Sequence, residues 1–119
     1  MKRLFAALLL SALTLAAADP SGNWTGSMKP ADGSEEHPIY MILKADGAKL
    51  SGSGGPGAGE QHPFDGGSLE GDRLVFTVVA GKGTFHFDLK LKDGKIEGAV
   101  ELRGGPETRT GKVVLEPAK

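Results

Sequence analysis

Short β-prone runs separated by glycine-containing turns dominate this chain from residue 19 onward. Glycine or proline interrupts nearly every ten residues there, and no window shows the 3.6-residue apolar period of an amphipathic helix. Asp93-Gly94 lies between two alternating runs and is a dipeptide typical of a two-residue β-hairpin. The pattern therefore predicts an all-β antiparallel fold.

Eight runs have the composition of strands. The expected strands are Gly22–Met28, Pro38–Ala45, Ala48–Ser53, His62–Leu69, Arg73–Ala80, Thr84–Lys92, Lys95–Leu102 and Thr108–Glu116. Because tight turns join most of them, we expect an up-and-down β-barrel, whose closure removes the two exposed sheet edges. Ser51–Gly59 contains only Gly, Ser, Pro and Ala, so we expect a loop over most of that segment.

The run Thr84–Lys92 shows the clearest two-residue alternation. Phe85 and Phe87 fall on one face, whereas His86 and Asp88 fall on the other. Applied to every run, this parity predicts an apolar interior and a charged exterior, the reverse of a transmembrane barrel, so we expect no membrane span. The expected interior residues are Trp24, Ile39, Met41, Leu43, Leu50, Phe64, Leu69, Leu74, Phe76, Val78, Phe85, Phe87, Ile96 and Val100.

The first eighteen residues have the order of a secretion signal. Lys2 and Arg3 precede an apolar stretch, Leu4–Leu15, and the small residues Ala16–Ala18 follow it. The apolar stretch is shorter than the roughly 20 residues needed to span a bilayer. We therefore expect a signal peptide over residues 1–18, cleaved after Ala18, and a single secreted or periplasmic domain over residues 19–119.

Charge and cysteine content exclude several functions. The chain carries a formal charge of −1, and loss of Lys2 and Arg3 with the leader makes it −3. No basic stripe remains to neutralise phosphates, so we expect no nucleic-acid partner. The chain has no cysteine, which excludes a disulfide, a thiolate nucleophile and a cysteine-bound metal.

The tripeptide Gly22-Asn23-Trp24 at the start of the first run resembles the calycin group, and in particular small lipocalin-like secreted β-barrels of bacteria. In that group the indole of a Gly-x-Trp plugs one end of the barrel, and avidin-like relatives continue with Gly-Ser, as Gly26-Ser27 does here. Lipocalins also pack an arginine over this Trp, for which Arg103 and Arg109 are the candidates. The resemblance implies an exported, non-enzymatic protein that holds a small apolar or amphipathic ligand.

An eight-stranded barrel is wide enough either to be filled by side chains or to hold one small ligand. Inward glycines such as Gly26, Gly52 and Gly98 favour leftover space, whereas the bulky aromatic residues favour filling. For Trp24 we expect mainly a core role, because large aromatic residues are usually buried. The candidate ligand-binding residues are Trp24, Met41, Phe64, Phe76, Phe85 and Phe87.

The three histidines offer an alternative. His37, His62 and His86 lie near the starts of the second, fourth and sixth expected strands, which share one end of a meander barrel. Three imidazoles and an open position can hold a catalytic metal such as zinc. Parity points His37 and His62 inward and His86 outward, so His37 and His62 are the candidate metal ligands. Solvated histidines at strand starts are the simpler interpretation.

A second alternative is a protein-interaction barrel. Parity turns Tyr40 and Ile42 outward, where they could contact a partner. The chain is similar in outline to secreted inhibitors of bacterial metalloproteases, which also begin with Gly-x-Trp. It departs from them by lacking their cysteine pair and by having only the short arm Asp19-Pro20-Ser21.

No motif indicates a cofactor or a hydrolase. The glycine-rich stretch Ser51–Gly55 lacks the strand-to-helix context of a phosphate-binding loop. No Gly-x-Ser-x-Gly elbow occurs, and no carboxylate pair lies within an apolar run. We therefore expect a protein that is not an enzyme.

Overall fold

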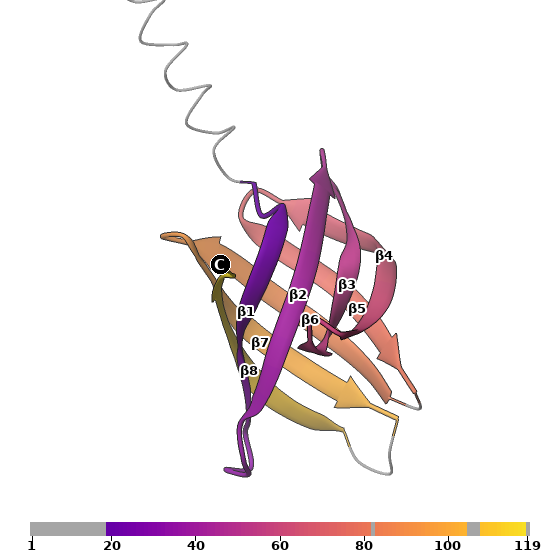
Figure 1. Ribbon diagram of the computed structural model, residues 1–119, viewed down its shortest axis with the longest axis vertical. Helices are drawn as coiled ribbons and strands as arrows, with labels where there is room; N and C mark the ends of the chain where they lie inside the picture. Colours follow the sequence, from indigo (N-terminus) through magenta and orange to yellow (C-terminus); the bar gives the residue numbers. More distant parts are fainter. Residues whose placement is uncertain (1–18, 82, 105–107, 119) are drawn as a thin grey trace, which may run out of the picture.

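The computed structural model describes residues 19–81, 83–104 and 108–118, which form a closed antiparallel barrel (Figure 1). Its strands are β1 (Gly22–Pro30), β2 (His37–Asp46), β3 (Lys49–Gly57), β4 (Glu60–Glu70), β5 (Arg73–Ala80), β6 (Gly83–Lys92), β7 (Lys95–Arg103) and β8 (Arg109–Pro117). Each strand pairs with the next along the chain, and β8 pairs back onto β1. The all-β up-and-down barrel is therefore confirmed, and the expected signal peptide lies outside the described residues.

Closure leaves neither β1 nor β8 as a free edge. Trp24 lies opposite Met41 of β2 and Pro117 of β8, so the start of β1 is covered on both sides.

No stretch of helix among residues 19–81, 83–104 and 108–118 is long and apolar enough to cross a membrane.

The connections at the two ends of the barrel differ. At the end where β1 begins, two-residue turns join β2 to β3, β4 to β5 and β6 to β7. Asp93 and Gly94 both have positive φ there, 54° and 77°, as a two-residue hairpin requires. At the other end the exposed residues 31–36 form the longer β1–β2 connection, which lies at the bottom of Figure 1.

The prediction of a loop over most of Ser51–Gly59 is wrong, because β3 runs to Gly57 and pairs with both β2 and β4. Glycine makes this possible by allowing close approach of neighbouring backbones. A Cβ at Gly52 would overlap the carbonyl oxygen of Ile42, and one at Gly55 would overlap that of Glu60. Glycine content here therefore marks tight backbone packing and not an irregular loop.

The same geometry corrects the expectation that inward glycines leave space in the barrel. A Cβ at Gly26 would overlap the carbonyl oxygen of Val114, and one at Gly98 would overlap that of Asp88. These positions are filled by neighbouring backbone, so they contribute no volume to a cavity.

The core confirms the parity prediction. Twelve of the fourteen expected interior residues are buried, and the other two, Leu69 and Phe85, are partly buried and pack against them. The core also includes Leu89, Val113 and Leu115. The sheet therefore curls with its apolar face inward, and no charged residue is buried in the described part of the chain.

Four phenylalanine rings form a stack inside the barrel. Ring centroids are 4.4 Å apart for Phe64 and Phe76, 5.0 Å for Phe76 and Phe87, and 6.4 Å for Phe87 and Phe85. The rings are within 18° of parallel, and each such contact contributes about 0.5–1.5 kcal/mol beyond simple burial. The stack links β4, β5 and β6 from the packed interior toward the end where β6 begins.

Candidate functional site

Trp24 closes one end of the barrel. Its indole Nε1 donates a hydrogen bond of 2.8 Å to the carbonyl oxygen of Pro20, and both residues are buried. The hydroxyl oxygen of Ser21 accepts a hydrogen bond from the backbone N–H of Ala45, which ties the segment before β1 to the end of β2. We call this the closed end.

Asp19 stabilises the same segment from outside. Its carboxylate accepts a hydrogen bond of 2.9 Å from the backbone N–H of Ser21. Hydrogen bonds from Ser21 lower the pKa of Asp19 below its ordinary value. The segment before β1 is therefore held as a short turn, which keeps the Pro20 carbonyl oxygen next to the indole of Trp24.

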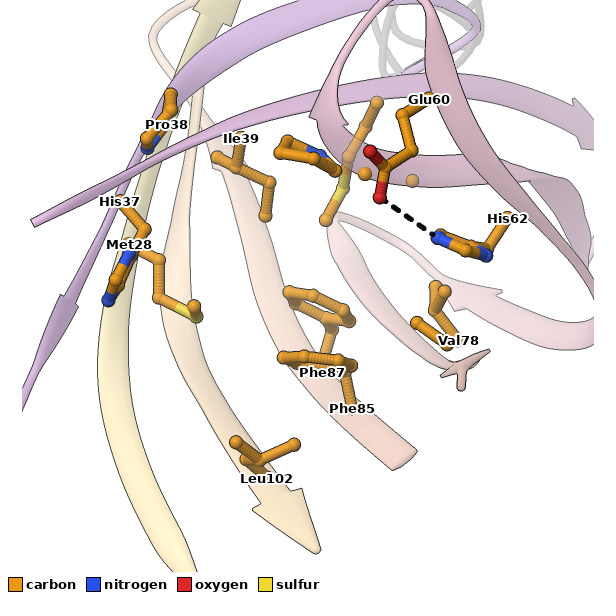
Figure 2. A pocket seen from close by; sticks show the side chains of 15 residues that line it. Met28, His37, Pro38, Ile39, Glu60, His62, Val78, Phe85, Phe87 and Leu102 are labelled. Carbon is orange, nitrogen blue, oxygen red and sulfur yellow. Dashed lines mark ion pairs between the residues drawn. The ribbon is translucent and has the colours of Figure 1, made fainter. Parts of the chain in front are cut away.

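A cavity of about 400 Å³ opens at the opposite end, which we call the open end. The buried side chains of Met41, Val78 and Phe87 line it. The partly buried side chains of Phe85 and Leu102 line it nearer the solvent (Figure 2). Met28 and Ile39 complete its apolar wall. The cavity is thus an apolar cup with a solvent-facing opening.

One wall of the cavity is backbone. Gly54 of β3 lies opposite Met41 and His62, and a Cβ there would meet Met41 and Val78 at an ordinary 3.6 Å. Unlike Gly52 and Gly55, this glycine does not face a neighbouring carbonyl oxygen. The absence of a side chain at Gly54 therefore contributes directly to the cavity volume.

The side chain of Gln61 holds this wall in shape. The pairing of β3 with β4 shifts between Gly54 and Gly57, where two β3 residues face one of β4. The Gln61 amide nitrogen donates to the carbonyl oxygens of Tyr40, at 3.0 Å, and Gly57, at 2.9 Å. Its amide oxygen accepts from the Ser53 hydroxyl at 2.7 Å. One side chain thus joins three strands beside the irregularity.

The polar side chains of the cavity lie at its rim. His37 begins β2, and Glu60 and His62 lie at the start of β4. Glu60 Oε2 is 3.7 Å from His62 Nε2, the contact drawn as a dashed line in Figure 2. Polar groups at the rim and apolar groups inside suit a molecule with an apolar body and a polar end.

The candidate ligand-binding residues divide into two groups. Met41, Phe85 and Phe87 line the cavity. Phe64 and Phe76 lie beneath it as the buried part of the ring stack, whereas Trp24 lies at the closed end. The structure thus brings together three of the six residues at one opening.

The three histidines separate as parity predicts. His37 and His62 both line the cavity, but Figure 2 shows them on opposite sides of it. His86 lies on the outer face, where its Nδ1 is 2.8 Å from the hydroxyl of Thr77 on β5. Within residues 19–81, 83–104 and 108–118, no group of three or more His, Asp or Glu side chains is arranged to hold a metal ion.

Neither candidate arginine packs over Trp24, which corrects the expectation drawn from the lipocalin resemblance. Arg103 ends β7 and Arg109 begins β8, so both lie at the open end. Arg103 is exposed and pairs with Glu101 beside it on β7. The closed end is instead completed by Pro20.

The predicted protein-contact residues lie on the outside of β2. Ile42 is 39% exposed, and Tyr40 is half-buried. A partner for them stays a prediction.

Sequence reasoning missed several cavity residues. Met28 and Leu102 lie near the ends of β1 and β7 on the inward parity, and Val78 was expected only as core. The place of Met28 and Leu102 at the open end could have been predicted, because odd-numbered strands of a meander end where even-numbered strands begin. Gly54 had no such signal, since a glycine has no side chain whose direction can be predicted.

Comparison of the sequence with models of known protein families finds no matching family, and comparison with curated proteins finds no match.

Proposed function

We propose that this protein is an exported, non-enzymatic binding protein that holds a small apolar or amphipathic molecule in the cavity, as lipocalin-like barrels do. The observation that carries the proposal is the 400 Å³ cavity at the open end of a barrel that is otherwise packed. Ligand sites in proteins commonly have volumes of about 300–1,000 Å³ and predominantly apolar walls.

Binding in such a cavity follows from the hydrophobic effect. An apolar ligand removes its own surface and that of Met41, Phe85 and Phe87 from water, at about 25 cal/mol for each Å² buried. The walls belong to paired strands, so the binding shape exists before the ligand arrives and little conformational entropy is lost. The polar end of the ligand stays near His37, Glu60 and His62 at the rim.

Export is the part of the proposal that rests on residues 1–18. Their order of basic, apolar and small residues supports cleavage after Ala18. Cleavage there would leave Pro20 in place beneath Trp24, so the closed end would be retained in the processed protein.

The test is a titration of the protein with N-phenyl-1-naphthylamine, whose fluorescence rises in apolar surroundings. We expect saturable binding to the unmodified protein. Gly54→Val places a side chain inside the cavity and should weaken binding about tenfold or more.

Gly59→Val is the matched control. Gly59 lies in the turn between β3 and β4, where a Cβ meets no atom within 4 Å, and it does not line the cavity. We expect this variant to bind the probe as the unmodified protein does. Equal binding by all three proteins, or no saturable binding by any, would overturn the proposal.

A further inference from the structure

The formal charge of the cavity lining is negative. Among its residues, with histidine counted as neutral, only Glu60 carries a formal charge. No lysine or arginine contributes to the lining within the described part of the chain. A ligand anion seated in the cavity would therefore lack a permanent cationic partner among the lining residues, whereas a ligand cation would have the Glu60 carboxylate.

The carboxylate of Glu60 is free to accept hydrogen bonds from a ligand. Its contact with His62 is 3.7 Å long, which is beyond hydrogen-bond distance. Within residues 19–81, 83–104 and 108–118, no side chain or backbone N–H donates to this carboxylate. Figure 2 shows it directed toward His62 at the edge of the cavity.

The aromatic residues of the cavity also favour a cation near Glu60. Phe85 lies near the solvent and stacks on Phe87 beneath it, so aromatic surface and a carboxylate border the same opening. Both carboxylates and aromatic ring faces attract cations, and neither attracts anions.

We propose that the cavity selects cationic amphiphiles: molecules with an apolar body that fills the cup and a protonated amine or similar cation that pairs with Glu60 at the rim. This inference rests on the proposed function and names the class of ligand. A second polar contact is available from His37 on the opposite side of the opening.

The experiment compares three ligands with the same chain, namely decylamine, decanol and decanoate, by displacement of N-phenyl-1-naphthylamine at pH 7.5. We expect decylamine to bind most tightly and decanoate least tightly. Glu60→Gln should weaken decylamine binding about threefold to fivefold, the range of a solvent-exposed ion pair, and leave decanol binding unchanged.

Glu36→Gln is the matched control, because Glu36 is an exposed carboxylate at the open end that does not line the cavity. It should keep the preference for decylamine. Gly54→Val should weaken binding of decylamine and decanol together, which shows that both occupy the cavity.

The outcomes separate the two proposals. Displacement by decanol with no advantage for decylamine, or an advantage that survives Glu60→Gln, overturns the cationic preference and leaves the binding function standing. If decanoate binds most tightly, the cationic preference is also overturned and the binding function stands. Failure of all three ligands to displace the probe, or no saturable probe binding, overturns both.

Discussion

The indole nitrogen of Trp24 and the carbonyl oxygen of Pro20 are joined by a buried hydrogen bond of 2.8 Å across the closed end of the barrel. Because both partners are shielded from water, loss of either leaves a polar group unpaired. This contact links the segment before β1 to the barrel core and places Trp24 away from the cavity.

Trp24→Phe should lower the free energy of unfolding by about 1–3 kcal/mol, since the Pro20 carbonyl would lose its partner while most apolar contact is kept. Trp24→Ala should cost about 3–5 kcal/mol. Urea denaturation measures both. Affinity for N-phenyl-1-naphthylamine should not change in Trp24→Phe, and a large loss of affinity would contradict the assignment of Trp24 to the closed end.

Substitutions within the phenylalanine stack and at its end should have different effects on stability and on probe binding. Phe76 is 3% exposed and contacts rings on both sides, so Phe76→Ala should cost about 3–5 kcal/mol. Phe85 is only partly buried and lies at the end of the stack, so Phe85→Ala should cost less than about 2 kcal/mol. It should nevertheless weaken probe binding more than its effect on unfolding suggests, and equal unfolding costs for the two variants would count against this arrangement.

Gly52 should not tolerate any side chain. Its φ of 144° is unfavourable for other residues, and a Cβ would overlap the carbonyl oxygen of Ile42. Gly52→Ala should therefore lower the free energy of unfolding by more than about 3 kcal/mol. Gly57→Ala on the same strand should change it by less than about 0.5 kcal/mol, because the added methyl group meets no neighbouring atom. Thermal melts of the two variants compare them directly.

The ion pair between Arg73 and Asp88 on the outer face should show a defined pH dependence. Hydrogen bonds of 3.0 and 2.7 Å from the guanidinium, together with its charge, hold the pKa of Asp88 below its ordinary value. A lowered carboxyl pKa stabilises the fold above the ordinary pKa range of aspartate, and this stabilisation is lost as the pH falls through the folded-state pKa.

Arg73→Gln should therefore raise the pKa of Asp88, as measured by NMR titration of its carboxyl carbon. The small stability difference from the unmodified protein should be present at about pH 7 and shrink toward about pH 2. Lys112→Gln, which also removes an exposed positive charge, should leave the Asp88 pKa unchanged. An unshifted pKa in Arg73→Gln would contradict the assigned cause.

Side-chain parity made the barrel predictable from sequence. The run Thr84–Lys92 alternates so regularly that its inward face is determined, and Asp93-Gly94 determines the hairpin that follows it. β3 was only partly predictable, because Gly52 and Gly55 lie in the strand where the backbones of β2 and β4 pack closely against them. The sequence of β3 alone does not show these contacts.

The cavity was less accessible to sequence reasoning than the core. Parity identifies which residues point inward but not how neighbouring side chains share the interior volume. Phe64 and Phe85 have the same inward direction, yet one is buried beneath the cavity and the other borders it. Gly54 illustrates the limit, since its contribution depends on the distances to Met41 and Val78 across the barrel.

The β1–β2 connection, residues 31–36, is exposed along its whole length and lies at the open end, whereas the turns at the closed end have two residues each. Exposed connections of this kind accept insertions at little thermodynamic cost. In the binding role proposed above, sequence change in this segment would alter access to the cavity while the Trp24–Pro20 contact and the phenylalanine stack stay unchanged. A change of ligand specificity would then leave the barrel itself as it is.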